Sequence, residues 1–205
     1  MLTLAALAGC GPISGTARPS PAADTAALPA PLPATSVPTA AALSAPAVPP
    51  DWIETVDSAT GIRIQHPPTW ALAGASASRA EFQDSASLAW LEVSIITEAN
   101  AFEWGLDYDA EAPVESVLET LLSASTGGAG GTPAERILMQ DGGSGWAASG
   151  WNPLINDRVW IGVTRLPQGL VLVLGHYELS ESETNWPDGL VDTYSTLFST
   201  VAPGG

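Results

Sequence analysis

The sequence predicts an α+β fold, in which an antiparallel β-sheet is flanked by helices. Short stretches with the alternating pattern of β-strands occur before and after a helical stretch, so the element order is strands, helix, strands, helix. All eight tryptophans, three tyrosines and three phenylalanines lie in residues 51–205, and about 155 residues are enough to bury a core. We therefore expect one folded domain over 51–205.

The first half of this domain predicts two pairs of strands. The four stretches are residues 52–57, 61–66, 80–84 and 88–97. In the second stretch Ile62 and Ile64 alternate with polar neighbours, which is the period-2 signature of a half-buried strand. Two prolines at 67 and 68 end it, because proline cannot continue the ladder of hydrogen bonds. The third and fourth stretches are expected to form a hairpin.

Residues 113–125 give the clearest helical pattern. Pro113 stands at its start and two glutamates follow early, which is typical of a helix N-terminus. The apolar residues at helical spacing are Val114, Val117, Leu118, Leu121 and Leu122. The glycine-rich stretch 126–131 ends the helix, and we interpret it as a flexible connection.

Four strands and a terminal helix are expected after the glycines. The strands are 134–141, 145–151, 158–166 and 170–179, and the helix is 187–201. The strand over 170–179 is almost continuously apolar, which indicates a central position in the sheet. The helix carries an apolar stripe made of Leu190, Tyr194, Leu197, Phe198 and Val201.

The composition changes near residue 50. Residues 11–50 hold ten prolines and no aromatic residue. Frequent proline removes backbone donors, and too little bulky apolar surface remains to offset the entropy of ordering. We therefore expect residues 10–50 to be a disordered tether with polyproline II character, reaching about 120 Å when fully extended.

The charge excludes two classes of partner. The chain has 22 acidic and six basic residues, for a formal net charge of −16. Such a chain repels phosphate backbones, so we expect no nucleic acid partner. It also repels an anionic bilayer, so docking on a membrane through charge is not expected either.

The single cysteine, Cys10, follows Leu7, Ala8 and Gly9 at the end of a short apolar run. This stretch resembles the lipobox of bacterial lipoproteins. The resemblance implies that residues 1–9 are the whole or the last part of a signal peptide, and that Cys10 carries a diacylglyceryl group and a further acyl chain such as palmitate. Several acyl chains give stable attachment. The implied location is the extracytoplasmic face of the cell membrane, with the lipid at Cys10 as the membrane contact.

Few residues suggest catalysis or metal binding. The only histidines are His66 and His176, and neither a zinc pattern nor a nucleophile elbow is present. Asp107, Asp109 and Glu111 alternate in an acidic loop over 98–111, and they are weak candidates for a calcium site. The alternative is a solvated loop before a helix N-terminus. We predict no catalytic residue, no metal and no cofactor.

The tryptophans allow two interpretations. Trp146, Trp151 and Trp160 lie on neighbouring predicted strands, and Trp90 and Trp104 flank the acidic loop. Aromatic rings beside carboxylates build carbohydrate and choline sites. The same rings also serve as core and half-buried sheet residues.

The start of the domain carries a recognisable motif. Its positions are Gly61, Ile62, Ile64, His66, Pro67 and Trp70, and the domain closes in "STLFSTV". Both stretches resemble the PsbP-like superfamily, which includes the extrinsic photosystem II protein and a Ran-binding import factor. The resemblance implies an α/β/α sandwich over most of 51–201 and a role in binding or assembly.

The sequence thus favours a membrane-anchored extracytoplasmic lipoprotein with a non-catalytic binding or assembly domain. Its partner is an unknown protein or small molecule. The alternative is a hydrolase or a calcium-dependent carbohydrate-binding module. Convergence of His176 with a serine and an acidic side chain would favour the hydrolase. Aromatic rings beside residues 107–111 in an open groove would favour the carbohydrate-binding module.

Overall fold

The computed structural model describes residues 44–179 and 185–204. The expected signal peptide, Cys10 and most of the expected tether lie outside these residues. The described part belongs to one compact unit, Ala41–Gly205. Residues at the end of the expected tether already contact this unit, since the Pro46 carbonyl accepts a hydrogen bond of 2.6 Å from Gln140 Nε2.

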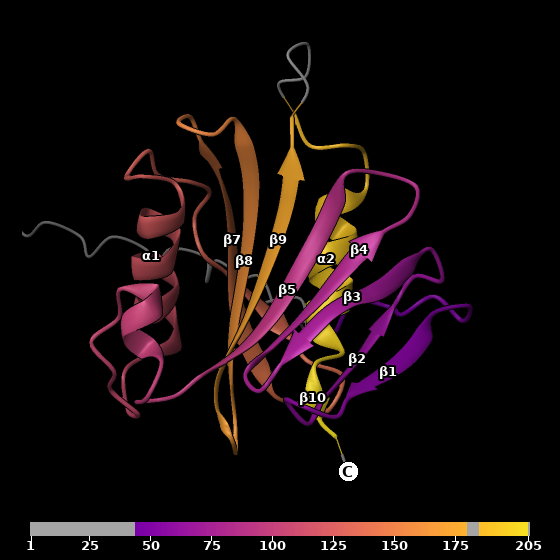
Figure 1. The fold of residues 1–205 in the computed structure, drawn as a ribbon, viewed down its shortest axis with the longest axis horizontal. Helices are drawn as coiled ribbons and strands as arrows, with labels where there is room; N and C mark the ends of the chain where they lie inside the picture. Colours follow the sequence, from indigo (N-terminus) through magenta and orange to yellow (C-terminus); the bar gives the residue numbers. More distant parts are fainter. Residues whose placement is uncertain (1–43, 180–184, 205) are drawn as a thin grey trace, which may run out of the picture. The chain divides into compact units, whose positions relative to one another are not determined.

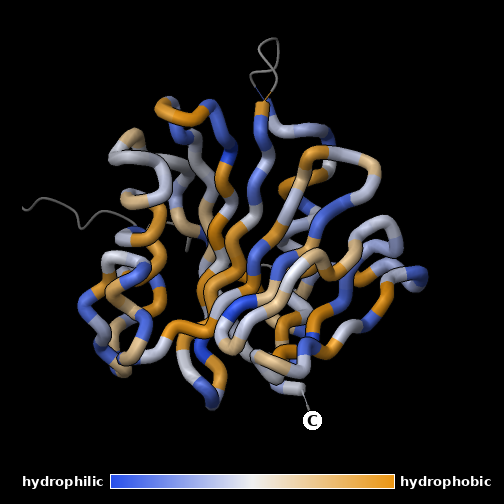
Figure 2. The backbone as a smooth tube through the Cα atoms, viewed as in Figure 1, coloured by the Kyte–Doolittle hydropathy of each residue, from blue (hydrophilic) through white to orange (hydrophobic). Residues whose placement is uncertain are grey.

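The centre of the unit is a seven-stranded sheet in the order β3-β4-β5-β9-β8-β7-β6 (Figure 1). The strands are β3 (Trp70–Ser76), β4 (Arg79–Asp84), β5 (Ala89–Ile96), β6 (Glu135–Leu138), β7 (Ser144–Asn152), β8 (Asp157–Leu166) and β9 (Gly169–Glu178). Every neighbouring pair is antiparallel. Figure 2 shows hydrophobic stretches along β8 and β9 where they cross the middle of the sheet.

A smaller sheet lies beside the large one. It consists of β1 (Ile53–Asp57), β2 (Ile62–His66) and β10 (Ala202–Pro203), with β2 in the middle. Ile62 and Ile64 of β2 are only 2% exposed and join the core on the side of the C-terminal helix. The backbone N–H of Gly204 donates to the carbonyl of Gly61 at 2.7 Å, which ties the C-terminal segment to the start of β2.

The helices cover the two faces of the large sheet unequally. On one face α1 (Val114–Ser125) packs over β7 and β8. On the other face α2 (Leu190–Ser199) packs together with the small sheet. A short 3₁₀ helix, η1 (Ala101–Trp104), lies between β5 and α1. Among the described residues, no helix is long and apolar enough to cross a membrane.

Glycines in the strands make room for the rings of α2. A Cβ on Gly145 would lie 2.4 Å from Cζ of Phe198, and one on Gly175 would lie 2.8 Å from the ring of Tyr194. Such distances are far below van der Waals contact, so any larger residue would push the helix away. The aromatic side chains of α2 are therefore seated directly on the strand backbone.

The expected elements are largely confirmed, and so is the α+β class. The strand over 170–179 is β9, which is the fourth of seven strands and thus central. The flanking layers hold few helices: within the described residues, α1 covers part of one face, and α2 shares the other face with the small sheet. The terminal helix also begins at Leu190 instead of residue 187, since Pro187 and a left-handed Gly189 (φ 76°) form the preceding turn.

Three elements, β3, β10 and η1, were not predicted from the sequence. Residues Trp70–Ser76 are mostly alanine, glycine and serine, with no β-branched residue and a single aromatic residue, Trp70, so their sequence carries a weak strand signal. β3 forms because it pairs with β4 at the edge of the sheet. Pairing across strands therefore overrides a weak local preference here.

Candidate functional site

The glycine-rich loop after α1 is fixed against β7, which corrects the expectation of a flexible connection. Gly131 forms a bridge with Gly150. The backbone N–H of Thr132 donates to the Ser149 carbonyl at 2.7 Å, and Thr132 Oγ1 accepts from the Ser149 N–H at 3.0 Å. A Cβ on Gly131 would lie 2.3 Å from the Ser149 carbonyl oxygen, so only glycine fits. The loop thus continues the sheet edge beyond β6.

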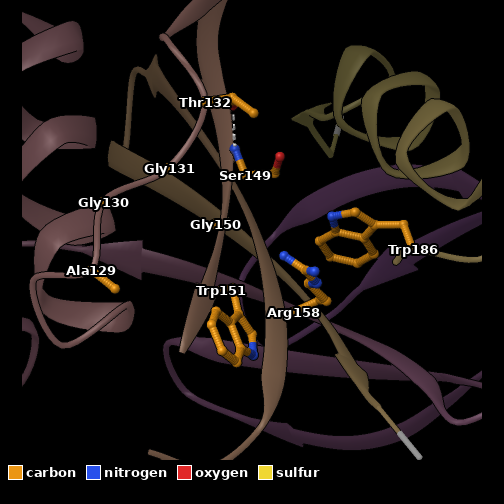
Figure 3. Close-up of a pocket in the computed structure, with 9 residues that line it drawn as sticks. All are labelled: Ala129, Gly130, Gly131, Thr132, Ser149, Gly150, Trp151, Arg158 and Trp186. Carbon is orange, nitrogen blue, oxygen red and sulfur yellow. Dashed lines mark hydrogen bonds between the residues drawn. The ribbon is translucent and has the colours of Figure 1, made fainter. Parts of the chain in front are cut away.

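This loop forms one wall of a hollow of about 420 Å³, shown in Figure 3. Its volume lies within the range of small-molecule sites. The lining residues are Ala129, Gly130, Gly131, Thr132, Ser149, Gly150, Trp151, Arg158 and Trp186. We call it the Arg158 hollow.

Arg158 lies between two indole rings. Its guanidinium carbon is 5.7 Å from the ring centroid of Trp151, within the range of a cation–π contact. Figure 3 shows the indole of Trp186 on the other side of the guanidinium. Trp186 is itself held by an edge-to-face contact with Tyr194, at 5.8 Å between ring centroids. The rings therefore restrict where the guanidinium can point.

The positions of Trp151 and Arg158 follow from the β7–β8 hairpin. The two residues are paired directly across it. Both side chains lie on the α2 side of the sheet, because Trp160, two residues after Arg158, joins the core on that side. Trp151 stays 41% exposed, so it offers a ring to a ligand.

A second cluster brings His176 together with Asp157 and Trp90. The Nδ1 atom of His176 lies 2.5 Å from Oδ2 of Asp157, and the imidazole stacks on Trp90 with 3.9 Å between centroids. Nε2 of His176 is buried and has no hydrogen-bond partner within residues 44–179 and 185–204. A hydrolase would place a nucleophile hydroxyl on that nitrogen. Among the described residues, His176 thus has the acidic partner of a triad but no serine on Nε2.

Asp107, Asp109 and Glu111 are not arranged as a set of metal ligands. Within residues 44–179 and 185–204, no group of three or more His, Cys, Asp or Glu side chains is placed to hold a metal ion. Oδ1 of Asp109 instead accepts a hydrogen bond of 2.8 Å from the backbone N–H of Glu111. The neighbouring rings of Trp104 and Tyr108 are partly buried and pack against the core on the α1 side.

The motif at the start of the domain has structural roles. Ile62, Ile64 and Trp70 are core residues. His66 Nε2 lies 2.8 Å from Thr55 Oγ1, and its Nδ1 lies 2.9 Å from the Pro67 carbonyl. Both ring nitrogens are thereby used within the small sheet and its exit turn.

Of the residues that line the Arg158 hollow, Trp151 was a candidate from the sequence, whereas Arg158 and Trp186 were not. One signal was available for Arg158: a hairpin between the strands 145–151 and 158–166 places residues 151 and 158 opposite each other. No comparable signal existed for Trp186, which follows β9 and reaches the hollow only through the packing of α2.

The comparisons with known proteins give weak similarities. No family model matches the chain, and no curated protein matches it. Among solved structures, the chain is similar to the cyanobacterial PsbP (CyanoP) from Synechocystis sp. PCC 6803, with 19% sequence identity and a TM-score of 0.41, over 74% of this chain and 91% of that chain. A protein from Bacteroides thetaiotaomicron VPI-5482 is 8% identical with a TM-score of 0.36, over 72% of this chain and 47% of that chain. With both TM-scores below 0.5, neither similarity informs the chemistry of this chain.

Proposed function

We propose that this protein is a non-catalytic binding protein that a lipid on Cys10 anchors to the extracytoplasmic face of a membrane. Its ligand occupies the Arg158 hollow and carries a carboxylate beside a ring. The resemblance of residues 7–10 to a lipobox supports the anchor, and the proline-rich stretch that follows suits a domain held clear of a surface. The resemblance of residues 61–70 to the PsbP-like superfamily supports binding or assembly.

The observation that carries the ligand class is a guanidinium held between two indoles. A guanidinium has five N–H donors in one plane, so it can serve a carboxylate beside the contacts it already makes. The exposed face of Trp151 packs against a flat apolar ring or the C–H face of a sugar. Arg158 therefore supplies charge recognition, and Trp151 with Trp186 supplies the apolar contact.

Calorimetry with paired small molecules tests this assignment. The full chain, produced with Cys10→Ser so that it stays unlipidated, is titrated with benzoate and glucuronate and with their neutral counterparts, benzyl alcohol and glucose. We expect at least one acid to bind about tenfold tighter than its counterpart, as charge-assisted hydrogen bonds predict. Arg158→Gln removes this preference. The control Arg63→Gln, on β2 with a side chain 44% exposed, keeps it.

Equal binding of acid and neutral molecule, or an unchanged preference in Arg158→Gln, contradicts the proposed ligand. Trp151→Leu is the second variant, since it removes the ring without touching the charge. We expect it to weaken acid and neutral molecule alike. Phe102→Leu, at a ring 73% exposed on η1, is the matched control and is expected to have no effect.

The anchor has its own test. Wild type expressed in a bacterium with a lipoprotein pathway should fractionate with membranes, and Cys10→Ser should move to the soluble or secreted fraction. Mass spectrometry of the N-terminal peptide of the wild type should show acyl chains on residue 10. Retention of the Cys10→Ser variant in the membrane fraction contradicts the lipid anchor. It does not bear on the ligand proposed for the Arg158 hollow.

A further inference from the structure

The face of the sheet that carries α1 is open over β3, β4 and β5. α1 packs on β7 and β8, and Figure 1 shows no described helix across the other strands of this face. A hollow of about 240 Å³ lies there, lined by Ala73, Glu81, Phe82, Gln83 and Trp90. A bulge in β3 lies at this hollow: the register with β4 shifts between Leu72 and Gly74, which leaves Ala73 unpaired. We call it the Trp90 hollow.

One face of the Trp90 indole is available to this hollow. In the sheet Trp90 pairs with His176 of β9 on one side and with Gln83 of β4 on the other. The imidazole of His176 stacks on the indole with an angle of 5° between the rings, so it covers the face toward β9. The other face looks toward β4 and the hollow. An aromatic face carries negative electrostatic potential and attracts cations.

The neighbouring charges leave a surplus of negative charge. Arg79 contacts two carboxylates at once, that of Glu81 at 3.1 Å and that of Glu92. Glu92 is 1% exposed and also accepts a hydrogen bond of 2.6 Å from Ser94 Oγ. One guanidinium neutralises only one of the two carboxylates. The exposed member, Glu81, has a side chain 44% exposed and lines the hollow.

We propose that the Trp90 hollow is a second binding site, which takes a positively charged group of the ammonium or guanidinium class. The cation stacks on the free face of Trp90, and the carboxylate of Glu81 and the side-chain carbonyl of Gln83 contact its N–H or N–CH₃ groups. The site is independent of the Arg158 hollow, since it lies on the opposite face of the sheet and selects the opposite charge. The net charge of −16 draws cations toward the protein from a distance.

Nuclear magnetic resonance of the tryptophan indole N–H groups tests the site. The full chain with Cys10→Ser is titrated with tetramethylammonium, and with tert-butanol as a neutral molecule of similar shape. The Trp90 signal is assigned by its loss in Trp90→Phe. We expect a saturable shift of this signal with tetramethylammonium and none with tert-butanol. Equal shifts with the two molecules, or a shift that never saturates, overturn the proposal.

Substitution of the carboxylate separates a site from a general charge effect. Glu81→Gln is expected to weaken tetramethylammonium binding about three- to fivefold, as a cation–π site beside one fewer charge predicts. Glu103→Gln removes an equal charge from η1, away from the hollow, and is expected to leave the affinity unchanged. Equal effects of the two substitutions overturn the proposal. Because the Glu81 side chain is half-exposed, Glu81→Gln is expected to fold like the wild type.

A comparison of two cationic probes identifies the source of the cation. N-acetyl-arginine-amide is titrated in parallel with tetramethylammonium. Tighter binding of the arginine derivative supports a basic side chain of a protein partner. Tighter binding of tetramethylammonium supports a small quaternary ammonium compound. Binding of neither molecule at the Trp90 signal overturns the site.

Discussion

The two faces of the large sheet are closed in different ways. On the α2 side, the rings of Tyr194 and Phe198 are fully buried and rest on strand glycines. On the α1 side, strands β3 to β5 keep Glu81, Gln83 and Trp90 around a hollow. The rings of Tyr194 and Phe198 beneath α2 serve stability, and strands β3 to β5 on the other face leave aromatic and charged groups accessible. Aromatic content alone therefore does not reveal a binding site, since the layer packed above each ring decides its role.

The largest expected effect concerns Phe198, on the face of the large sheet that α2 covers. Phe198→Ala removes a fully buried ring and leaves a cavity, so we expect the free energy of unfolding to fall by about 3–5 kcal/mol. Phe102→Ala is the matched control, because that ring is 73% exposed, and a change within about 0.5 kcal/mol is expected. Urea denaturation of both variants measures the difference. Similar losses would show that the two faces are not distinguished by packing.

The next effect tests the close approach of α2 to the strands. Gly145→Ala places a methyl group 2.4 Å from the ring of Phe198, and we expect a loss of about 1–3 kcal/mol from overpacking. Gly74→Ala, in β3, is the control on the α1 side of the sheet. Its new methyl group would meet only Glu81 Oε2, at 3.6 Å, which is ordinary contact. Thermal unfolding should rank Gly145→Ala well below Gly74→Ala, and the reverse order would contradict the fold described above.

Tyr194 makes the free energy of unfolding depend on pH in the alkaline range. Burial is the main cause that raises the pKa of Tyr194 far above its ordinary value, and the charges of Asp157 and Asp84 raise it further. Because the folded pKa exceeds the unfolded value, the resulting stability is complete below pH about 10 and is lost as the pH rises above it. Absorbance at alkaline pH should show Tyr194 titrating only with unfolding.

The matched variants for this prediction are Tyr194→Phe and Tyr108→Phe. Tyr194 Oη donates a hydrogen bond of 2.7 Å to the carbonyl of His176, so Tyr194→Phe should cost about 1 kcal/mol at neutral pH. It should also flatten the fall of stability above pH about 10. Tyr108 is only partly buried against the α1-side core, so Tyr108→Phe should cost less stability at neutral pH than Tyr194→Phe.

The smallest expected effect compares the two hollows in salt. Binding of tetramethylammonium at the Trp90 hollow is favoured by both the local carboxylate and the net charge, so it should weaken between about 20 and 200 mM salt. Binding of a carboxylate at Arg158 is favoured locally and opposed by the net charge of −16, so its salt dependence should be shallower. Calorimetry at both salt concentrations measures the two slopes. A steeper slope for the carboxylate would contradict the opposite charge selectivity of the two hollows.

The elements themselves were predictable wherever a pattern is local. Alternation identified β2, helical spacing identified α1, and a continuous apolar run placed β9 at the centre of the sheet. A central strand contacts a layer on each face, so its sequence carries that information directly. β3 was missed because it forms through pairing with β4, and its small residues show no alternation of their own.

The sequence by itself thus determined the fold class, the central strand and the helices α1 and α2, because each depends on the periodicity of one continuous segment. Only the tertiary structure decided the sites. Trp186 reaches Arg158 through the packing of α2, and Trp90 gains one covered and one open face from the strands beside it. The physical reason is that a hollow is made by side chains from separate segments. Strand order, register and the covering layer set their distances, and no single stretch of sequence carries all three.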